Sequence, residues 1–383
     1  MSQIPFRRLS AFYFFYFAVL GGFMPYWGLY LQKQLQFTPA LIGQLMAITV
    51  GTRIIAPNFW GYIADRSGKR LALVRLGALM LMLFWCGIFF VREYWSIAFV
   101  LLGYSFFQNA ILAQFEAVTV AHLGENRAQY GRIRLWGSLG FIATVAGLGL
   151  LFDVVSLRWL PLILAGCALA SWLSSLSVPD IATARREDAH TSLWAILKRP
   201  TVFGFLGASF LLELSHAPYY TFYSIYLEGH HYSHSSIGWL WALGVGAEVL
   251  AFTQMHRILP ALGERRLMLV SLALAGFRWW VIGQAVEYPF VLIAMQTLHA
   301  ASFATFHASC INLIYKHFGD GHQGQGQALY SMLWGLGVAL GSWWAGGVWK
   351  TLGPTHIYDA AALSCVAAFA VVWLTVRDAS SQA

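Results

Sequence analysis

Between two long apolar segments the chain carries the ten residues 61–70, G-Y-I-A-D-R-S-G-K-R. The flanking segments, 40–64 and 71–91, are each long enough for a helix that crosses a membrane, which takes about 20 apolar residues. Asp65 stands among three basic residues in this loop. A carboxylate there can cap a helix N-terminus, or bind a basic group in one conformation and release it in another. The stretch therefore predicts a polar latch between two membrane helices.

The composition extends this prediction to the whole chain. Of its 383 residues, 58% are hydrophobic and 10% are charged, whereas soluble domains carry about 25% charged residues. Residues 1–8 lack the order of a cleavable signal, so we expect the first apolar run to remain as a span. The twelve apolar segments are 11–31, 40–64, 71–91, 95–120, 132–152, 157–177, 202–227, 235–259, 266–286, 289–315, 324–349 and 355–376. We expect an all-α membrane protein.

Basic residues are distributed unequally over the loops between these segments. When the connections are assigned alternately to the two sides, sixteen Lys and Arg residues fall on one side and four on the other. Cytoplasmic loops carry an excess of Lys and Arg, so we expect both termini in the cytoplasm and a multi-pass chain in the bacterial inner membrane. The net charge of +8 therefore reflects topology, and nucleic acid is not an expected partner. The sixteen are Arg7, Arg8, Arg66, Lys69, Arg70, Arg127, Arg132, Arg185, Arg186, Lys198, Arg199, Arg257, Arg265, Arg266, Lys316 and Arg377.

Short patterns occur once in each half of the chain. P-Y-W at 25–27 is similar to P-Y-Y at 218–220, and L-W-G occurs at 135–137 and again at 333–335. The offsets of 193 and 198 residues are those that duplication of a six-helix unit requires. Such repeats build transporters with a substrate site near the membrane midplane.

These repeats predict a division of the chain into three parts. We expect an N-terminal six-helix bundle at 1–178, a cytoplasmic linker at 179–200 and a C-terminal six-helix bundle at 201–383.

One apolar segment carries a polar stripe. At 100° per residue, five side chains between Met295 and Cys310 fall within an arc of roughly 140°. Polar groups in hydrocarbon are costly, so these side chains should face protein or water and are functional candidates. The alternative is that the two histidines only hydrogen-bond a neighbouring helix. The five are Gln296, His299, Ser302, His307 and Cys310.

Further ionisable residues lie inside the predicted spans. Charged groups at this depth must pair or line a cavity, so we expect acids and bases to meet across helices. The four cysteines lie in apolar runs without a C-x-x-C pattern, so we expect no disulfide framework, metal site or cofactor. The ionisable residues are Arg53, Glu116, Arg134, Glu213, His216, Glu248, Arg278, His299 and His307.

The loop 61–70 matches the signature G-x-x-x-D-[RK]-x-G-[RK]-[RK] of the major facilitator superfamily at every defined position. The resemblance implies the fold of that superfamily, with twelve transmembrane helices in two six-helix bundles. It also implies a conformational latch made by Gly61, Asp65, Arg66, Gly68, Lys69 and Arg70. The corresponding loop of the second half, at 263–266, keeps so little of the signature that we interpret it as a degenerate copy.

The chain as a whole resembles the lactose-permease-like branch of that superfamily, and most closely its 3-phenylpropionate transporter family. F-E-A at 115–117 and G-R-I-R-L-W-G at 131–137 are similar to the sugar-binding acid–arginine motifs of the permease. The resemblance implies that Glu116 and Arg134 bind substrate, and Phe141 falls at the position of a sugar-stacking tryptophan.

The second half resembles the permease in its eighth to tenth spans. A-E-V-L at 247–250 and Q-T-L-H at 296–299 are similar to G-E-L-L and K-T-L-H, and Arg278 falls at the arginine of the ninth span. The resemblance implies that Glu248, Arg278 and His299 couple proton movement to substrate binding.

The chain also departs from the permease. Ser302 replaces its proton-carrying glutamate, Gln296 replaces a lysine, and two aspartates correspond to Glu213 and His216. Sugar specificity is therefore not implied. Our first prediction for the proton carrier is Glu248 and the second is Glu213, with His216, His299 and His307 as relays.

Arg53 has no counterpart in the permease. Because guanidinium binds carboxylate through two hydrogen bonds, Arg53 predicts either an anionic substrate or an ion pair with Glu116. Ring residues such as Tyr26 suit an aromatic ligand, although lipid and interface packing is the favoured explanation for each ring taken singly.

These observations predict a proton-coupled symporter that imports a small organic substrate by alternating access. An aromatic carboxylate such as 3-phenylpropionate is the first expectation, and the alternatives are a sugar or nucleoside symporter or an exporter. Import is favoured because residues 137–152 lack the G-P pair typical of antiporters. A membrane-bound transferase is disfavoured because no D-x-D or H-x-x-x-x-D pair lies at a membrane edge. The expected partners are substrate, proton and lipid bilayer, and we expect a monomer.

Overall fold

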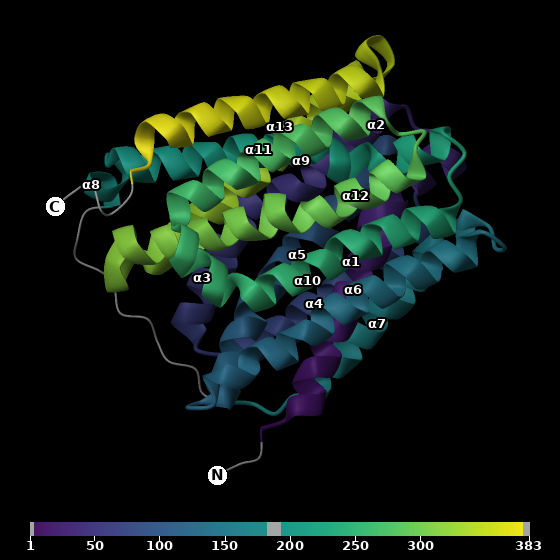
Figure 1. Ribbon diagram of the computed structural model, residues 1–383. Helices are drawn as coiled ribbons and strands as arrows, with labels where there is room; N and C mark the ends of the chain where they lie inside the picture. Colours follow the sequence, from purple (N-terminus) through teal and green to yellow (C-terminus); the bar gives the residue numbers. More distant parts are fainter. Residues whose placement is uncertain (1–3, 182–192, 378–383) are drawn as a thin grey trace. The chain divides into compact units, whose positions relative to one another are not determined.

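The computed structural model describes residues 4–181 and 193–377. In these ranges the chain is helical and contains no strand. The first helices are α1 (Phe6–Gln34), α2 (Pro39–Gly51), α3 (Ala56–Ser67), α4 (Arg70–Cys86), α5 (Tyr94–Leu123), α6 (Tyr130–Phe152) and α7 (Leu160–Ser177). They are followed by α8 (Leu193–Leu197), α9 (Pro200–Gly229), α10 (His234–Leu262), α11 (Glu264–Gln284), α12 (Pro289–His299) and α13 (Thr305–Thr375) (Figure 1).

These helices have the lengths that a membrane requires. Ten helical stretches of the described chain are long and apolar enough to cross a bilayer. The last of them, His322–Thr375, breaks at Gly353, whose φ of 78° lies outside the helical region, so it holds two spans. The 30-residue helix α9, which carries the buried acid Glu213, is one more helix of spanning length. The predicted all-α membrane fold with twelve membrane helices is confirmed.

The chain divides into two compact units. One comprises Met1–Arg186 with Tyr232–Ala242, and the other comprises Glu187–His231 with Leu243–Ala383. The part of the predicted linker at 182–192, which includes Arg185 and Arg186, lies outside the described residues.

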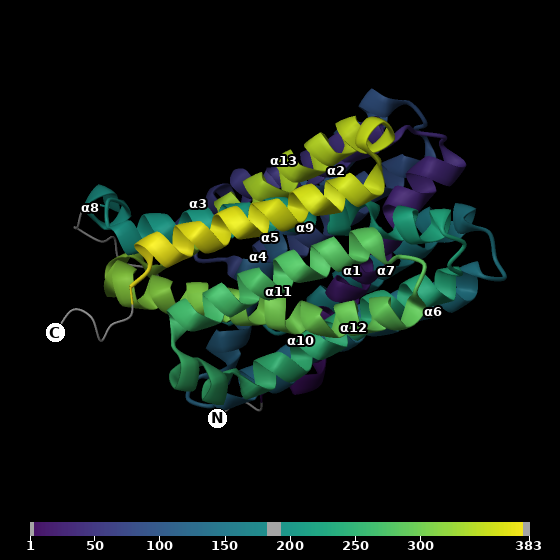
Figure 2. The ribbon, with the colours of Figure 1, turned by 45° about the horizontal axis from the view of Figure 1, so that its top comes forward.

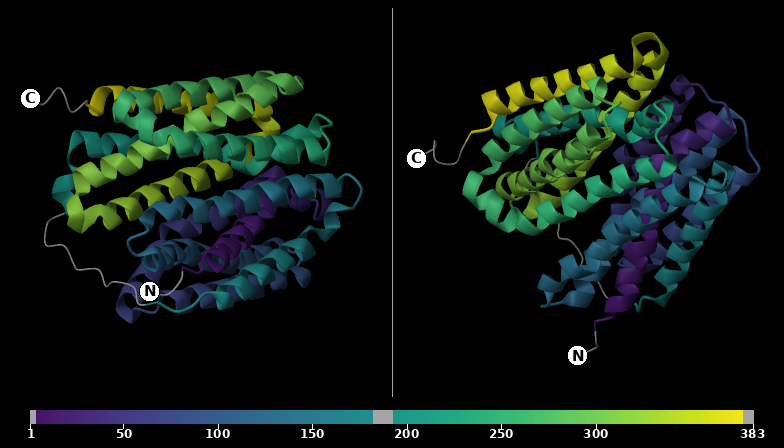
Figure 3. Two further views of the ribbon diagram at one scale, coloured as in Figure 1. Left: turned by 60° about the horizontal axis from the view of Figure 1, so that its bottom comes forward. Right: turned by 45° about the vertical axis from the view of Figure 1, so that its right-hand side comes forward.

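In the first unit, α1 packs against α6 and α7 (Figure 3). Two glycines allow this contact. A Cβ atom on Gly140 would lie 2.1 Å from the carbonyl oxygen of Phe14, and one on Gly21 would lie 2.6 Å from that of Phe141. Small residues let membrane helices approach until their backbones touch.

The apolar run 40–64 predicted one continuous helix for the second span of the first unit. The structure instead breaks this span. α2 ends at Gly51, a 3₁₀ turn occupies Thr52–Ile54, and α3 begins at Ala56. Pro57 in the first turn of α3 has no N–H, so it cannot donate the helical hydrogen bond to the carbonyl oxygen four residues earlier, at Arg53. The break places Arg53 in the turn.

In the second unit, α13 runs along α9 and along α11, as Figures 1 and 2 show for its last segment. Glycines again set the distance between the packed helices, here α13 and α9. A Cβ on Gly337 would lie 2.6 Å from the carbonyl oxygen of Phe210, and one on Gly341 would lie 2.6 Å from that of Leu214.

The beginning of α10 belongs to the first unit, where it meets the end of α6. Both carboxylate oxygens of Asp153 accept the backbone N–H of Ser235 at 3.3 Å, and the Ser233 hydroxyl accepts that of Ser236 at 3.1 Å. Two N–H groups that a helix start leaves unpaired are thereby satisfied. Burial alone would raise the pKa of Asp153, but the hydrogen bonds from Ser235 outweigh it and lower that pKa below its usual value.

Candidate functional site

Arg278 of α11 is the centre of a polar network in the second unit, and its side chain is fully buried. Its Nε donates to the carbonyl oxygen of Met295 at 2.9 Å, one Nη donates to Nδ1 of His299 at 2.9 Å, and the other donates to Oε1 of Gln296 at 3.1 Å. The guanidinium carbon lies 4.6 Å from the ring centre of Tyr219. One guanidinium thus joins α11 to α12 and α9.

The network fixes the proton positions on His299. A guanidinium can only donate, so Nδ1 of His299 must accept the hydrogen bond and carries no proton. The neutral ring then carries its proton on Nε2, which donates to Oε1 of Glu248 at 2.6 Å. Arg278, His299 and Glu248 therefore form a directed series of hydrogen bonds from α11 through α12 to α10. The side chain of Glu248 is 18% exposed, so this end of the series is the open one.

His307 lies on the same helix face as His299 because of an irregular turn. The turn η5 (Ala300–Ala304) is π-helical. Such turns are rare in proteins as a whole, but many of them occur at functional sites. The ring of Phe303 stacks on His299 at 5.6 Å and on His307 at 6.1 Å. Nδ1 of His307 is 2.8 Å from the hydroxyl of Tyr330 on α13. The two histidines of the predicted stripe therefore lie in a column of stacked rings with Phe303 between them.

Glu213 and His216 lie one turn apart on α9, and both are buried. Nδ1–H of His216 donates to the carbonyl oxygen of Leu212 at 2.9 Å, which leaves Nε2 as an acceptor. That nitrogen is buried and has no hydrogen-bond partner among the residues that the structure describes. The ring of His216 lies edge-on to that of Trp279 at 4.8 Å, and 5.8 Å from that of His299. His216 therefore adjoins the network, and Glu213 lies one turn from His216 on the same helix.

The first unit holds the second group of candidates. Oε1 of Glu116 on α5 lies 3.8 Å from Nε of Arg134 on α6, and the side chains are 38% and 30% exposed. The guanidinium carbon of Arg134 also lies 4.1 Å from the ring centre of Phe17 and 5.6 Å from that of Tyr13. At 3.8 Å the pair is an ionic contact without a hydrogen bond. Arg134 can therefore accept a further anion.

Arg53 lies at the break in the second span. Its Nε donates to Oδ1 of Asn109 at 3.2 Å, and the amide nitrogen of Asn109 donates to Thr52 at 2.8 Å. Sequence reasoning missed Asn109, although a polar amide within the apolar run 95–120 was a usable signal.

Phe141 and Tyr26 are buried in the contact of α1 with α6. Phe141 is 7% exposed, and its carbonyl oxygen faces Gly21. The hydroxyl of Tyr26 donates to the carbonyl oxygen of Val145 at 2.7 Å. Both contribute to helix packing here, and their contact with substrate stays a prediction.

The loop at 61–70 is tied to its neighbours by its charged residues. Arg70 pairs with Asp65 and also donates to Gln114 of α5 at 2.6 Å, while Arg66 donates to the Tyr62 hydroxyl at 2.8 Å. Gly68 ends α3 with a φ of 67°, a left-handed conformation that favours glycine. Lys69 donates its backbone N–H to Ser67, and Gly61 has open space where a side chain would lie.

The equivalent loop of the second unit, at 263–266, contains an acid with polar partners, although its sequence indicated only a degenerate copy of the signature. Glu264 begins α11 after Gly263, whose φ is 75°, and its carboxylate pairs with Lys316 and accepts a hydrogen bond from Asn312. In both units an acid of this loop is therefore held by polar side chains. The signature is lost at 263–266, and the acid there is held by α13, whereas Asp65 pairs with Arg70 of its own loop.

The described residues offer no group of three or more His, Cys, Asp or Glu side chains that could hold a metal ion. Ionisable side chains instead gather inside bundles of membrane helices, around Arg278 in one unit and around Arg134 in the other. Buried ionisable groups of this kind mark substrate and ion pathways, which defines the class of protein as a membrane transporter.

Comparison with known proteins gives the family. The sequence model of the MFS_1 like family matches residues 6–360, so the chain belongs to this family of the major facilitator superfamily and is a transporter rather than an enzyme. It is 31% identical over 361 residues to the probable 3-phenylpropionic acid transporter of Escherichia coli (strain K12), covering 91% of this chain and 92% of that protein.

More distant relatives share the fold. The maltose permease of Geobacillus stearothermophilus is 26% identical, over 87% of this chain and 84% of that protein. The crystal structure of the nucleoside transporter NupG aligns with a TM-score of 0.83 at 20% identity, covering 97% of this chain and 99% of that one. The predicted superfamily and its fold are confirmed.

Proposed function

We propose that the chain is a proton-coupled symporter that imports a small aromatic carboxylate, such as 3-phenylpropionate, by alternating access. The observation that carries the proposal is the directed series Arg278–His299–Glu248. The similarity to a probable 3-phenylpropionic acid transporter supports this substrate class.

The series defines where a proton can be held. Protonation of His299 would place an N–H against the guanidinium of Arg278 and break their hydrogen bond. Glu248 can take a proton on its second oxygen while its first still accepts from His299. It is also the more exposed of the two. Glu248 is therefore the proposed proton carrier, with Glu213 as the second candidate and His216, His299 and His307 as relays.

The first unit provides the proposed site for the carboxylate. Arg134 is partly exposed and its contact with Glu116 is long, so its guanidinium can bind a carboxylate through two hydrogen bonds. The rings of Phe17 and Tyr13 beside it suit an aromatic substrate. Arg53 is a second cation that could bind the carboxylate, whereas Arg278 is fully buried and each of its three guanidinium nitrogens already donates a hydrogen bond.

Charge balance gives a reason for coupling. Protonation of Glu248 leaves the charge of Arg278 without its acidic partner, and a bound carboxylate leaves an added negative charge in the carrier. Uncompensated charge in a low-dielectric interior is costly. Loading one proton together with one carboxylate adds no net charge, so the two should bind together.

We further propose that both termini and the predicted linker 179–200 are cytoplasmic and that the chain acts as a monomer in the bacterial inner membrane. The basic loops support this orientation. The bundles 1–178 and 201–383 would then alternate the access of the site.

The test uses the purified chain in proteoliposomes with an imposed proton gradient and radiolabelled 3-phenylpropionate. Wild type should accumulate the label, and Glu248→Gln should lose accumulation but keep exchange of internal for external substrate. Glu287→Gln, which alters an exposed acid, is the matched control. Accumulation by Glu248→Gln at the wild-type level would refute the assignment of the proton carrier.

The substrate site is tested with Arg134→Lys, which keeps the charge but loses the planar fork. Uptake at low substrate concentration should fall about tenfold or more, and Arg127→Lys at an exposed position is the control. Unlabelled maltose and nucleosides are the competitors. If either competitor displaces the label better than unlabelled 3-phenylpropionate does, the proposed aromatic carboxylate substrate is contradicted and the alternative substrate class is supported.

A further inference from the structure

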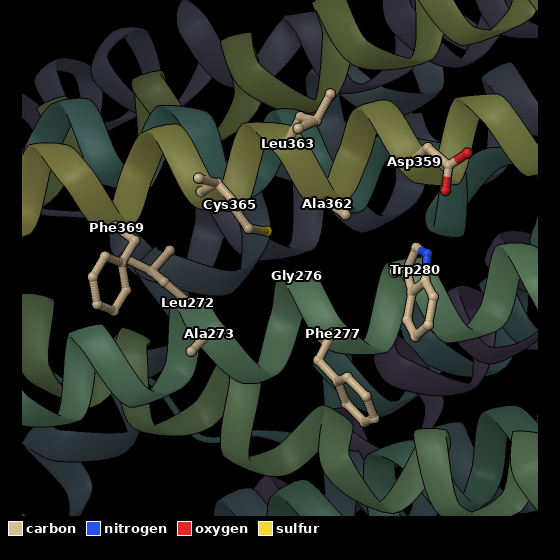
Figure 4. Close-up of a pocket in the computed structure, with 11 residues that line it drawn as sticks. Leu272, Ala273, Gly276, Phe277, Trp280, Asp359, Ala362, Leu363, Cys365 and Phe369 are labelled. Atoms are coloured by element: carbon tan, nitrogen blue, oxygen red, sulfur yellow. The ribbon is translucent and has the colours of Figure 1, made fainter.

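The second unit also contains a groove, and none of the groove's lining residues belongs to the series Arg278–His299–Glu248. The groove has a volume of about 550 Å³ and runs between α11 and the last span of α13 (Figure 4). Its side chains are apolar apart from one acid, Asp359, which lies with Trp280 at one end, while Phe369 lies at the other (Figure 4). The volume falls in the range of sites for small organic ligands.

The groove arises from a change of side-chain size along the two helices. Ala273 and Gly276 on α11 and Ala362 on α13 form its floor, and Phe277 and Trp280 form a wall (Figure 4). At Gly276 the helices are so close that a Cβ would lie 3.3 Å from the Cβ of Cys365. The floor is therefore fixed by backbone approach and does not depend on movable side chains.

The surroundings of the groove are apolar. Both helices belong to stretches that are long and apolar enough to span a membrane. Phe277 and Trp280 are 49% and 52% exposed, and Leu363 on the facing helix is 68% exposed. In a membrane such side chains contact hydrocarbon, so the groove opens to lipid.

The two ends of the groove differ in polarity, because Asp359 lies at one of them. Oδ1 of Asp359 accepts from the amide of Gln284 at 3.1 Å, and Oδ2 accepts from Nδ1 of His356 at 3.3 Å. The side chain of Asp359 remains 33% exposed. Each carboxylate oxygen has a second lone pair, so the acid can accept further hydrogen bonds.

We propose that this groove holds one acyl chain of a membrane phospholipid whose headgroup ammonium binds Asp359. The apolar walls accept the chain, and the carboxylate accepts charge-assisted hydrogen bonds from a primary ammonium. An anionic headgroup is repelled by the acid, and a quaternary ammonium has no N–H to donate. Trp280 beside Asp359 fits the usual place of tryptophan at the level of lipid headgroups. The site therefore selects phosphatidylethanolamine over phosphatidylglycerol and phosphatidylcholine.

The test needs no transport substrate, so its failure is distinct from a failure of the proposed function. The full chain is purified from bilayers containing equal amounts of the three lipids with identical acyl chains, and retained lipids are counted by native mass spectrometry. Wild type should retain one phosphatidylethanolamine molecule. Ala273→Phe, which fills the groove from an exposed position, should lose it, and Ala367→Phe, at an exposed position outside the lining, should retain it.

The headgroup contact is tested separately with Asp359→Asn. This variant should still retain one lipid, but its preference for phosphatidylethanolamine should fall about tenfold, as expected for the loss of a hydrogen bond to a charged group. The proposal is overturned if Ala273→Phe retains lipid as wild type does, or if wild type retains the three lipids equally. An unchanged preference in Asp359→Asn would overturn the role of the acid.

Discussion

The series Arg278–His299–Glu248 predicts that its two charged ends are energetically coupled although they do not touch. Arg278→Gln removes the donor to His299 and the charge that balances Glu248. Removing one partner of a buried charged pair typically lowers the free energy of unfolding by about 3–5 kcal/mol. Glu248→Gln leaves His299 with a neutral acceptor and should cost less, about 1–3 kcal/mol, because the glutamine carbonyl can still accept from Nε2.

The informative quantity is the unfolding free energy of the double variant, which combines Arg278→Gln with Glu248→Gln. Once Glu248 is neutral, the loss of Arg278 no longer strands an unpaired carboxylate. The cost of Arg278→Gln should therefore be smaller in the Glu248→Gln background by about 0.5–3 kcal/mol, the range of coupling between residues of one network.

The assay is equilibrium unfolding by SDS titration in mixed lipid–detergent micelles, with all four proteins at one pH. The control cycle combines Arg278→Gln with Glu287→Gln, an exposed acid in the loop after α11, and its two effects should add. Independent sites add within about 0.5 kcal/mol. If the Arg278 and Glu248 variants also add within that margin, the directed series is not an energetic unit and the proposed charge balance fails.

Two further predictions concern the first unit. Gly140→Ala should destabilise it by about 1–3 kcal/mol, because the new Cβ would collide with the carbonyl of Phe14, whereas Gly147→Ala, with open space around it, should be neutral or stabilising in the same SDS titration. Asp153→Asn should cost about 0.5–1 kcal/mol at neutral pH, because the hydrogen bond to the backbone N–H of Ser235 loses its charged acceptor and one of its two acceptor oxygens. Because the folded pKa of Asp153 lies below the unfolded value of about 3.9, its contribution is present above pH 4 and is lost as the pH falls through the folded pKa. A pH titration of stability should show this loss in wild type and not in the variant.

The membrane helices could be predicted from the sequence because hydropathy is a property of each segment alone. The predicted runs 95–120, 132–152 and 157–177 overlap α5, α6 and α7 almost throughout. The pairing of charges in the loop 61–70 was equally visible, because Asp65 and Arg70 both lie within that loop. The role of the loop as a latch stays a prediction.

Features that depend on neighbouring helices could not be predicted in this way. The apolar run 289–315 gave no sign of the π-helical turn at Ala300–Ala304, since an inserted residue leaves hydropathy unchanged. The sequence indicated that Arg278 would pair, but it could not show that the carbonyl of Met295 takes one of its donors. Tyr330, which meets His307, lies in a run whose many rings have no individual signal.

The choice of arginine at position 278 follows from these contacts. One buried charge must satisfy a backbone carbonyl, an amide oxygen and an imidazole nitrogen at fixed directions, and the planar guanidinium reaches all three with separate N–H groups. A lysine ammonium has donors on a single atom and cannot span acceptors set this far apart around a plane. By holding Nδ1 of His299 as an acceptor, Arg278 also opposes protonation of that ring. In the proposed function the proton is therefore carried by Glu248, the partly exposed end of the series. We propose that the arginine contributes to coupling through the tautomer that it imposes on His299, without contacting substrate or proton.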